Sequence, residues 1–241
     1  MAEITRQGRP IIEVKNLRKE YPTGDDVFVA LKRINLNIYP GEIVCIFGQS
    51  GSGKSTLLNQ LAALEKPTRG GVKIRGQIIS RMSENELAKF RQQYLGFVFQ
   101  AYNLLPNLTA AENVALPLMF RGVPKTQRLR QARQMLSRVG LPDRLDHFPN
   151  QMSGGQQQRV GIARALITKP EVIFADEPTG NLDSVTTIEV MELICSVARR
   201  LGQTVILVSH DREMADYADR IVTLRDGEII SDVQNKVRRT V

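Results

Sequence analysis

The chain has 241 residues, of which 42% are hydrophobic and 24% charged, values typical of a folded protein with one large domain or a domain with an insertion. No apolar run approaches the ~18 residues of a membrane-spanning helix, and the N-terminal stretch MAEITRQGRP lacks the apolar core of a signal peptide, so we expect a cytosolic chain. The two cysteines, Cys45 and Cys195, show neither disulfide nor metal-ligand spacing. The net charge of +8 suits nucleic acid, anionic lipid headgroups or a nucleotide, and does not decide among them.

Strand patterns fill residues 11–79. In RINLNIYPGE the apolar Ile34, Leu36 and Ile38 alternate with polar residues, which predicts a half-buried strand that ends at Pro40-Gly41. The run GVKIRGQII is typical of two short strands around a glycine turn.

Residues 101–168 change character and predict helices. Thr109 and Glu112 have the spacing of a capping box, the reciprocal pair of hydrogen bonds that starts a helix. Further on, an apolar stripe with helical spacing, which includes Leu129 and Leu136, stops at Gly140.

From residue 171 onward strands and helices alternate. VIFAD, SVTTIEVMELICSVARRLG and TVILVSH follow one another, which predicts a parallel sheet with crossover helices. In RIVTLRDGEII, Asp226-Gly227 is a two-residue hairpin turn. The sequence therefore predicts an α/β fold with a mixed sheet, an N-terminal antiparallel β part and an inserted helical subdomain at 101–165.

The strongest motif is GQSGSGKST, which follows the apolar strand EIVCIF and precedes a helical run. It matches the phosphate-binding pattern G-x-x-x-x-G-K-[ST]. Its backbone N–H groups are expected to curl around phosphate oxygens, Lys54 to supply a positive charge, and Ser55 to offer its hydroxyl to Mg²⁺. The predicted nucleotide-binding residues here are Gly48, Gln49, Ser50, Gly51, Ser52, Gly53, Lys54, Ser55 and Thr56.

A second motif, EVIFADEPTGNLD, ends an apolar strand in two adjacent carboxylates. Asp176 is expected to hold Mg²⁺, directly or through water, and Glu177 to orient and deprotonate the attacking water. The alternative interpretation is a solvated acidic turn. That interpretation is weaker for a pair of carboxylates that follows a phosphate-binding loop in the chain.

Three single residues complete the set. His210 ends the strand TVILVSH at the carboxyl edge of the predicted sheet, where ligands bind in open α/β folds, and a neutral imidazole there could hydrogen-bond the γ-phosphate. Gln100 ends the strand GFVFQ, where its amide could touch Mg²⁺ or water and report the nucleotide state to the insertion. Tyr21 could stack on a base, or be a turn tyrosine.

The stretch QMSGGQQQRVGIARA has the signature of a helix start. Ser153 stands three residues before Gln156, as in a capping box. Gly154 and Gly155 follow in the first turn, where each glycine costs roughly 1 kcal/mol relative to alanine. A serine, two bare backbone positions and free N–H groups favour an anion-binding site.

The order of these motifs resembles the ATP-binding subunits of ABC transporters over almost the whole chain, and MSGGQ is similar to that family's LSGGQ, with Met152 in place of leucine. The resemblance implies a single P-loop ATPase domain over 1–241, with its core at 1–100 and 166–241. It implies ATP and Mg²⁺ as cofactors. It also implies a head-to-tail dimer, in which Ser153–Gln156 bind the γ-phosphate of ATP held by the second copy and Asp183 lies in the loop between the copies.

A finer resemblance concerns FVFQAYNLLPNLTAAENVALPL and DEPTGNLD, which are similar to the branch that serves macrolide exporters and lipoprotein-release complexes. This implies a transmembrane permease partner with a large extracytoplasmic part, and an ATPase peripheral to the cytoplasmic face of the inner membrane. The exported or extracted substrate would be a lipoprotein, peptide, macrolide or similar molecule. A regulatory ATPase of a non-transporting membrane complex, as in cell division, is the alternative.

Basic residues crowd the segment 121–138. A solvated helix face is the favoured interpretation, and attraction to anionic lipid at about 1 kcal/mol per residue is the other. The resemblance places an ATPase acting on nucleic acid third, because the family members of that kind carry a long coiled-coil insertion or two ATPase domains. This chain has one phosphate-binding loop and only about a hundred residues between Lys54 and Ser153, and no aromatic residues lie among its arginines. No nucleic-acid partner is expected.

Overall fold

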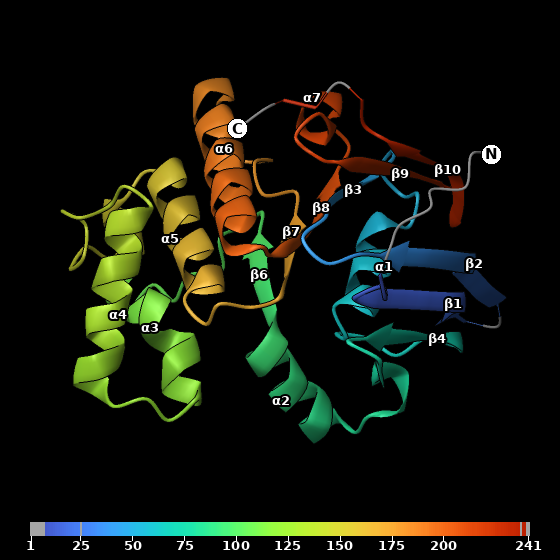
Figure 1. The fold of residues 1–241 in the computed structure, drawn as a ribbon, viewed down its shortest axis with the longest axis horizontal. Coiled ribbons are helices and arrows are strands. Elements are labelled where there is room, and N and C mark those ends of the chain that lie inside the picture. The colour runs from blue at the N-terminus through green and yellow to red at the C-terminus, as the bar shows by residue number, and fades with distance from the viewer. Residues whose placement is uncertain (1–7, 25, 237, 240–241) are drawn as a thin grey trace.

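The computed structural model describes residues 8–24, 26–236 and 238–239. It consists of two sheets and a layer of helices, with the helices α3, α4 and α5 gathered at one end of the molecule and the small antiparallel sheet at the other (Figure 1). Within the described residues, no helix combines the length and the apolar character needed to cross a membrane.

The first sheet is the predicted N-terminal antiparallel part. Its strand order is β2-β1-β4-β5. The alternation in β2 works as expected, because Ile34 and Ile38 are fully buried while the polar residues between them face outward. The strands are β1 (Ile12–Thr23), β2 (Asp26–Ile38), β4 (Arg69–Ile74) and β5 (Gln77–Ile78).

The second sheet is mixed, as predicted, with the order β10-β9-β3-β8-β7-β6. From β9 to β6 the neighbouring strands are parallel, so their carboxyl ends meet at one edge, and β10 returns antiparallel through the Asp226-Gly227 turn. This arrangement brings three distant motifs to the same edge. The strands are β3 (Ile43–Phe47), β6 (Leu95–Phe99), β7 (Val172–Asp176), β8 (Thr204–Ser209), β9 (Arg220–Arg225) and β10 (Glu228–Gln234).

The central sheet is buried on both faces, which explains its near-continuous apolar strands. In β3, Val44 and Ile46 pack into one core with the antiparallel sheet, whereas Ile43 and Cys45 pack into a second core with the helices. Both cysteine thiols are free and lie in this second core, where burial raises their pKa to about 12. The thiols are therefore kept neutral and unreactive.

The helical predictions are confirmed where capping signals were recognised. Thr109 caps α3 and Ser153 caps α5, both with complete capping boxes, and α4 ends just before Gly140. The exact limits of the subdomain, 101 and 165, stay a prediction. The helices are α1 (Lys54–Leu61), α2 (Glu84–Tyr94), α3 (Ala110–Phe120), α4 (Lys125–Arg138), α5 (Gly154–Leu166), α6 (Ser184–Leu201) and α7 (Arg212–Ala215), with 3₁₀ turns at Ile79–Arg81 and Pro149–Gln151.

Two helices, α2 and the short α7, were not anticipated from the sequence. In α2, Ser83 and Glu86 form a capping box of the same kind as in α3 and α5. The signal was therefore present, but only Leu87 and Phe90 of this helix are buried, so it lacks the long apolar stripe that revealed the others.

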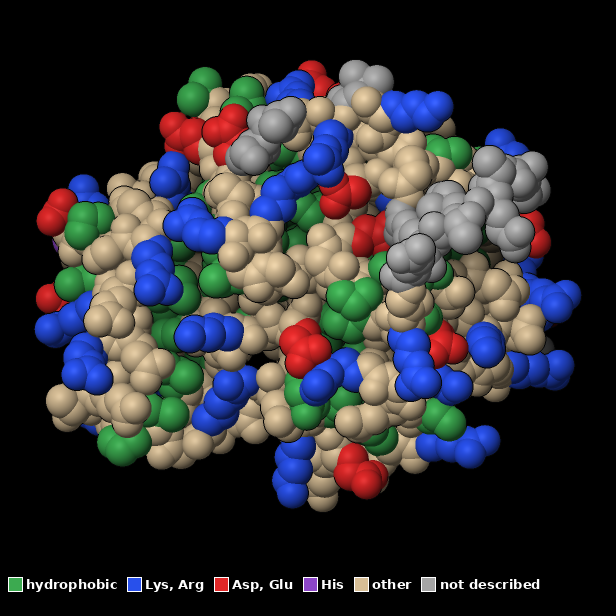
Figure 2. All heavy atoms as spheres, in the orientation of Figure 1, with side chains coloured by type: hydrophobic (Ala, Val, Ile, Leu, Met, Phe, Trp, Pro, Cys, Tyr) green, Lys and Arg blue, Asp and Glu red, His purple; other side chains and the backbone are tan. Residues whose placement is uncertain are grey.

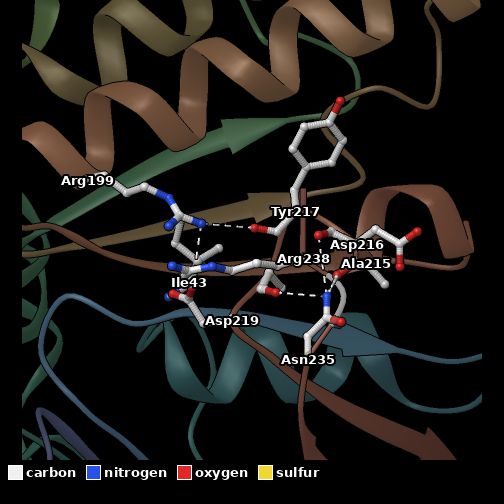
Figure 3. Close-up of polar contacts among 9 residues, drawn as sticks. Ile43, Arg199, Ala215, Asp216, Tyr217, Asp219, Asn235 and Arg238 are labelled. Carbon is white, nitrogen blue, oxygen red and sulfur yellow. Dashed lines mark hydrogen bonds and ion pairs between the residues drawn. The ribbon is translucent and has the colours of Figure 1, made fainter. Parts of the chain in front are cut away.

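A C-terminal segment fastens α7 to the sheet (Figure 3). The Asn235 amide donates to three carbonyl oxygens at the end of α7 and the turn after it, at 3.0–3.4 Å. Beside it, Asp219 accepts a hydrogen bond from the backbone of Ile43 and contacts the guanidinium groups of Arg199 and Arg238. These bonds join α6, α7 and the start of β3 at the amino edge of the sheet, away from the motifs.

Candidate nucleotide site

The phosphate-binding loop joins β3 to α1 and needs glycine for its shape. Gly51 and Gly53 have φ of 77° and 100°, which L side chains rarely adopt. A Cβ on Gly53 would also stand 2.8 Å from the carbonyl oxygen of Ala30. The loop therefore holds its backbone N–H groups in one conformation at the start of α1, where the helix dipole favours an anion.

A cavity of about 390 Å³ opens over this loop. Lys54 is buried at its base and donates to the Gln49 carbonyl oxygen at 2.8 Å, so its ammonium is held at the loop. The Ser52 hydroxyl is buried and has no hydrogen-bond partner among the described residues. Hydrogen-bond donors without partners around a buried ammonium group are suited to binding a chain of phosphates. The cavity is lined by Phe28, Ala30, Ser50, Gly51, Gly53, Lys54, Ser55, Thr56, Glu177 and His210.

The two carboxylates at the end of β7 differ in environment. Asp176 is half-buried, and burial together with the neighbouring Glu177 raises its pKa, partly offset by the positive charge of Lys54. Glu177 has a φ of 42°, so the backbone turns sharply between the two residues, and its side chain lines the cavity. Asp176 is not among the residues that line the cavity, and its role toward Mg²⁺ stays a prediction.

His210 and Glu177 meet at this edge, with Nδ1 2.9 Å from Oε1, and both line the cavity. An ionised carboxylate only accepts hydrogen bonds, so Nδ1 is the protonated nitrogen in this pair and Nε2 of a neutral ring is an acceptor. A hydrogen bond from His210 to a γ-phosphate therefore requires an imidazolium or release of Nδ1 from Glu177. Because Nδ1 faces Glu177, Nε2 is the ring nitrogen through which His210 would meet a γ-phosphate, and its role toward that phosphate stays a prediction.

Gln100 is not among the residues that line the cavity. Its amide and backbone carbonyl form hydrogen bonds with Asn181 at 3.4 and 3.1 Å, and a Cβ on Gly180 would stand 2.7 Å from its Nε2. Gln100 thus connects the end of β6 to the loop after Glu177.

The aromatic residue in the cavity is Phe28, which the sequence analysis missed. It is 58% exposed and pairs across the β1–β2 ladder with Tyr21. The Tyr21 hydroxyl donates to Glu65 at 2.7 Å, and its ring is covered by Lys19. In an alternating strand Phe28 looks like a core residue, and only the position of the hairpin over the loop exposes it beside the site.

The second glycine-bearing helix start does not line its own chain's cavity. The Ser153 hydroxyl accepts from the Gln156 amide, as predicted. A Cβ on Gly154 would stand 2.8 Å from the Tyr102 hydroxyl, and one on Gly155 would stand 2.4 Å from Thr186 Cγ2. Close packing therefore already requires small residues here.

Asp183 caps α6. Its carboxylate accepts from the backbone amides of Val185 and Thr186 and from the Thr186 hydroxyl, and the bonds to Thr186 come first among the causes that lower its pKa. This capping fixes the loop that the sequence predicted to lie between two copies.

Comparison with protein families decides the identity. The family model described as "ABC transporter" matches residues 31–180. This chain belongs to the ABC transporter family. It is one of the family's ATP-hydrolysing cassettes, and the matched stretch includes the phosphate-binding loop, Gln100, Ser153–Gln156 and the Asp176–Glu177 pair.

Individual proteins of high sequence identity belong to the same family. The cassette is 52% identical over 226 residues to the uncharacterized ABC transporter ATP-binding protein MJ1508 of Methanocaldococcus jannaschii, covering 94% of this chain and all of that protein. It is 50% identical over 225 residues to the macrolide export ATP-binding/permease protein MacB of Vibrio parahaemolyticus, covering 93% of this chain and 34% of that protein. The chain thus spans about a third of the length of the MacB proteins it matches.

Solved structures share the fold. The dimeric structure of the ATP-binding cassette MJ0796 in a post-hydrolysis state, bound to ADP and Pi, matches with a TM-score of 0.87 at 44% identity. It covers 93% of this chain and 99% of that one. A second dimeric MJ0796 structure, described as a bacterial ABC transporter cassette, also gives a TM-score of 0.87.

Proposed function

We propose that this cassette binds ATP with Mg²⁺ at its phosphate-binding loop and hydrolyses it with Glu177 as the general base. Lys54 and the loop amides hold the phosphates, and Phe28, which lines the cavity opposite Tyr21 on the β1–β2 ladder, offers an aromatic face for the base. Ser55 and Asp176 supply oxygen ligands of the kind that Mg²⁺ prefers. When bound, the ion neutralises charge on the phosphates.

The observation that carries this proposal is the Glu177–His210 pair at the cavity over the phosphate-binding loop. Glu177 takes a proton from the attacking water, and His210 holds the carboxylate beside the γ-phosphate. Gln100, bonded to Asn181, reports the state of the nucleotide to the helical layer.

We further propose that two copies enclose two ATP molecules. Ser153–Gln156 do not line their own cavity, yet α5 begins with uncommitted backbone N–H groups. The dimeric structures of MJ0796 support a second copy as the source of the missing contacts.

A transmembrane permease is the proposed partner, and a groove between α2, β6 and the helical layer is its proposed docking surface. The groove has a volume of about 770 Å³, and Figure 2 shows the surface hollowed between these parts. The residues that line it include Phe120, which is 69% exposed, and the basic Lys89 and Arg164. The fusion of cassette and permease in the MacB proteins supports this partner.

From this association follow the proposed location, peripheral to the cytoplasmic face of the inner membrane, and the proposed work, export or extraction of a macrolide, peptide, lipoprotein or similar substrate. The MacB likeness favours export over the regulatory alternative.

The chemistry is tested with Glu177→Gln. This variant should keep its ATP affinity and lose turnover by roughly 10²–10⁴-fold, because the amide cannot accept the proton. Nucleotide titration and steady-state phosphate release measure the two quantities. Near-normal phosphate release would remove Glu177 as the base.

The docking surface is tested with Phe120→Asp, which places a charge in the apolar groove. We expect an integral membrane protein to copurify at least roughly tenfold less with this variant, since burying an unpaired carboxylate costs more than 1.4 kcal/mol. Phe148→Asp is the control, because Phe148 is also exposed but does not line the groove. Equal losses in both variants would contradict the assignment.

A further inference from the structure

A glutamine of α5 is buried beside the loop that follows β7. Gln158 lies on α5, four residues after Gly154, and its side chain is fully buried. Its Nε2 donates to the carbonyl oxygen of Pro178 at 2.5 Å, while its Oε1 has no hydrogen-bond partner among the described residues. A buried amide with one unpaired atom costs stability, so its presence calls for a reason.

Pro178 directly follows Glu177, and the Glu177 backbone is strained. A φ of 42° is unfavourable for glutamate, so the surrounding contacts must hold it. The Glu177 amide donates to the Val208 carbonyl oxygen on β8, and the Gly180 amide donates to the Glu177 carbonyl oxygen, both at 3.0 Å. Proline has no N–H, so its carbonyl is the one backbone group through which Pro178 can be anchored. Gln158 binds that group.

We propose that Gln158 is a positioning residue for Glu177. By holding the Pro178 carbonyl, it keeps the Glu177 carboxylate turned toward the cavity and within reach of His210. Gln158 also makes the helix that begins with Ser153–Gln156 and the loop that carries the base move as one body. This inference rests on the proposed role of Glu177 as the base.

The test is Gln158→Met, which keeps the length of the side chain and removes the donor. We expect turnover per ATP-binding site to fall roughly tenfold with ATP affinity unchanged within about twofold, because a misaligned base lowers kcat rather than binding. Gln158→Asn is the second variant, since it keeps the amide but withdraws it from Pro178. Counting activity per ATP-binding site removes any unfolded fraction from the comparison.

Gln203→Met is a matched control. Gln203 is also buried, its Nε2 donates to the carbonyl oxygen of Pro170 at 2.7 Å, and its Oε1 likewise has no partner among the described residues. Pro170 precedes β7, at the opposite edge of the sheet from Glu177. Gln203→Met should lower the melting temperature about as much as Gln158→Met and leave turnover per site unchanged.

A double variant separates positioning from general damage. In the Glu177→Gln background, Gln158→Met should cost less than about twofold more in turnover, because no base remains to be positioned. The same tenfold loss in both backgrounds, or equal turnover of Gln158→Met and Gln203→Met, would overturn the inference. Normal turnover of Glu177→Gln by itself would instead overturn the proposed base.

Discussion

Two helix starts in this protein combine glycines with exposed N–H groups, and the structure shows that their glycines serve different purposes. At the start of α1, Gly51 and Gly53 have left-handed φ values, and the loop wraps its own cavity. At the start of α5, Gly154 and Gly155 belong to an ordinary helix, where an added Cβ would meet the Tyr102 hydroxyl and the Thr186 methyl group and make them shift.

The two helix starts thus show two different reasons for a glycine, namely backbone conformation at α1 and close packing at α5. A glycine with a positive φ shapes the loop that binds the ligand, whereas a glycine against a side chain lets two segments approach closely. The glycines of α5 therefore do not by themselves identify an anion site. The proposed contact of Ser153–Gln156 with ATP held by a second copy needs evidence other than these glycines.

The largest effect is expected at the loop. Gly53→Ala should reduce ATP affinity by roughly 100-fold or more, since a Cβ is strained at a φ of 100° and clashes with the Ala30 carbonyl oxygen. Gly155→Ala should change the affinity of the monomer by less than about threefold, since the Thr186 methyl can move aside. Isothermal titration at concentrations too low for dimerisation measures both. Equal losses of ATP affinity in the two variants would contradict the different roles assigned to the glycines of α1 and α5.

A smaller effect is expected on association. In the Glu177→Gln background, which should trap the ATP-bound dimer, Gly154→Asp places a carboxylate against the partner's γ-phosphate. Like charges at a desolvated contact cost several kcal/mol, enough to weaken the dimer by about 100-fold. Size-exclusion chromatography with ATP and Mg²⁺ gives the readout.

Gly154→Ala is the control for that experiment, because it adds the same Cβ near the Tyr102 hydroxyl without the charge. If Gly154→Ala disrupts the dimer as strongly as Gly154→Asp, packing explains the glycine and the contact with ATP loses its support. Loss of ATP binding by the folded Gly154→Asp monomer would show that the helix serves its own chain.

The smallest effect concerns stability. Burial and Glu177 raise the pKa of Asp176, so ionising this carboxylate opposes folding. As the pH rises from the ordinary carboxyl pKa through the raised one, the wild type loses stability that Asp176→Asn retains. The variant should melt roughly 1–3 °C higher at neutral pH without nucleotide, discounted for the partial exposure of the side chain. This difference in melting temperature should disappear as the pH falls below the ordinary carboxyl pKa. A difference in melting temperature that persists in acid would contradict ionisation of Asp176 as its cause.

The phosphate-binding loop and several helix starts could be predicted from the sequence, because each depends on a short pattern of residue types. Glycine spacing around Lys54 and the capping boxes at Thr109 and Ser153 each depend on residues within a few positions of one another. The alternation in β2 also predicted a half-buried strand, and the apolar runs of β7 and β8, separated by a helical run, predicted the parallel sheet.

Only the tertiary structure decided how distant segments meet. Strand order brings His210 next to Glu177, 33 residues away in the chain, and turns its Nδ1 toward the Glu177 carboxylate. It also exposes Phe28 beside the phosphate-binding loop and buries Gln158 against Pro178, the residue after Glu177. A local pattern cannot specify these contacts, because a side chain's environment depends on elements that the fold brings next to it, whereas glycine conformations and helix caps are fixed by their immediate neighbours.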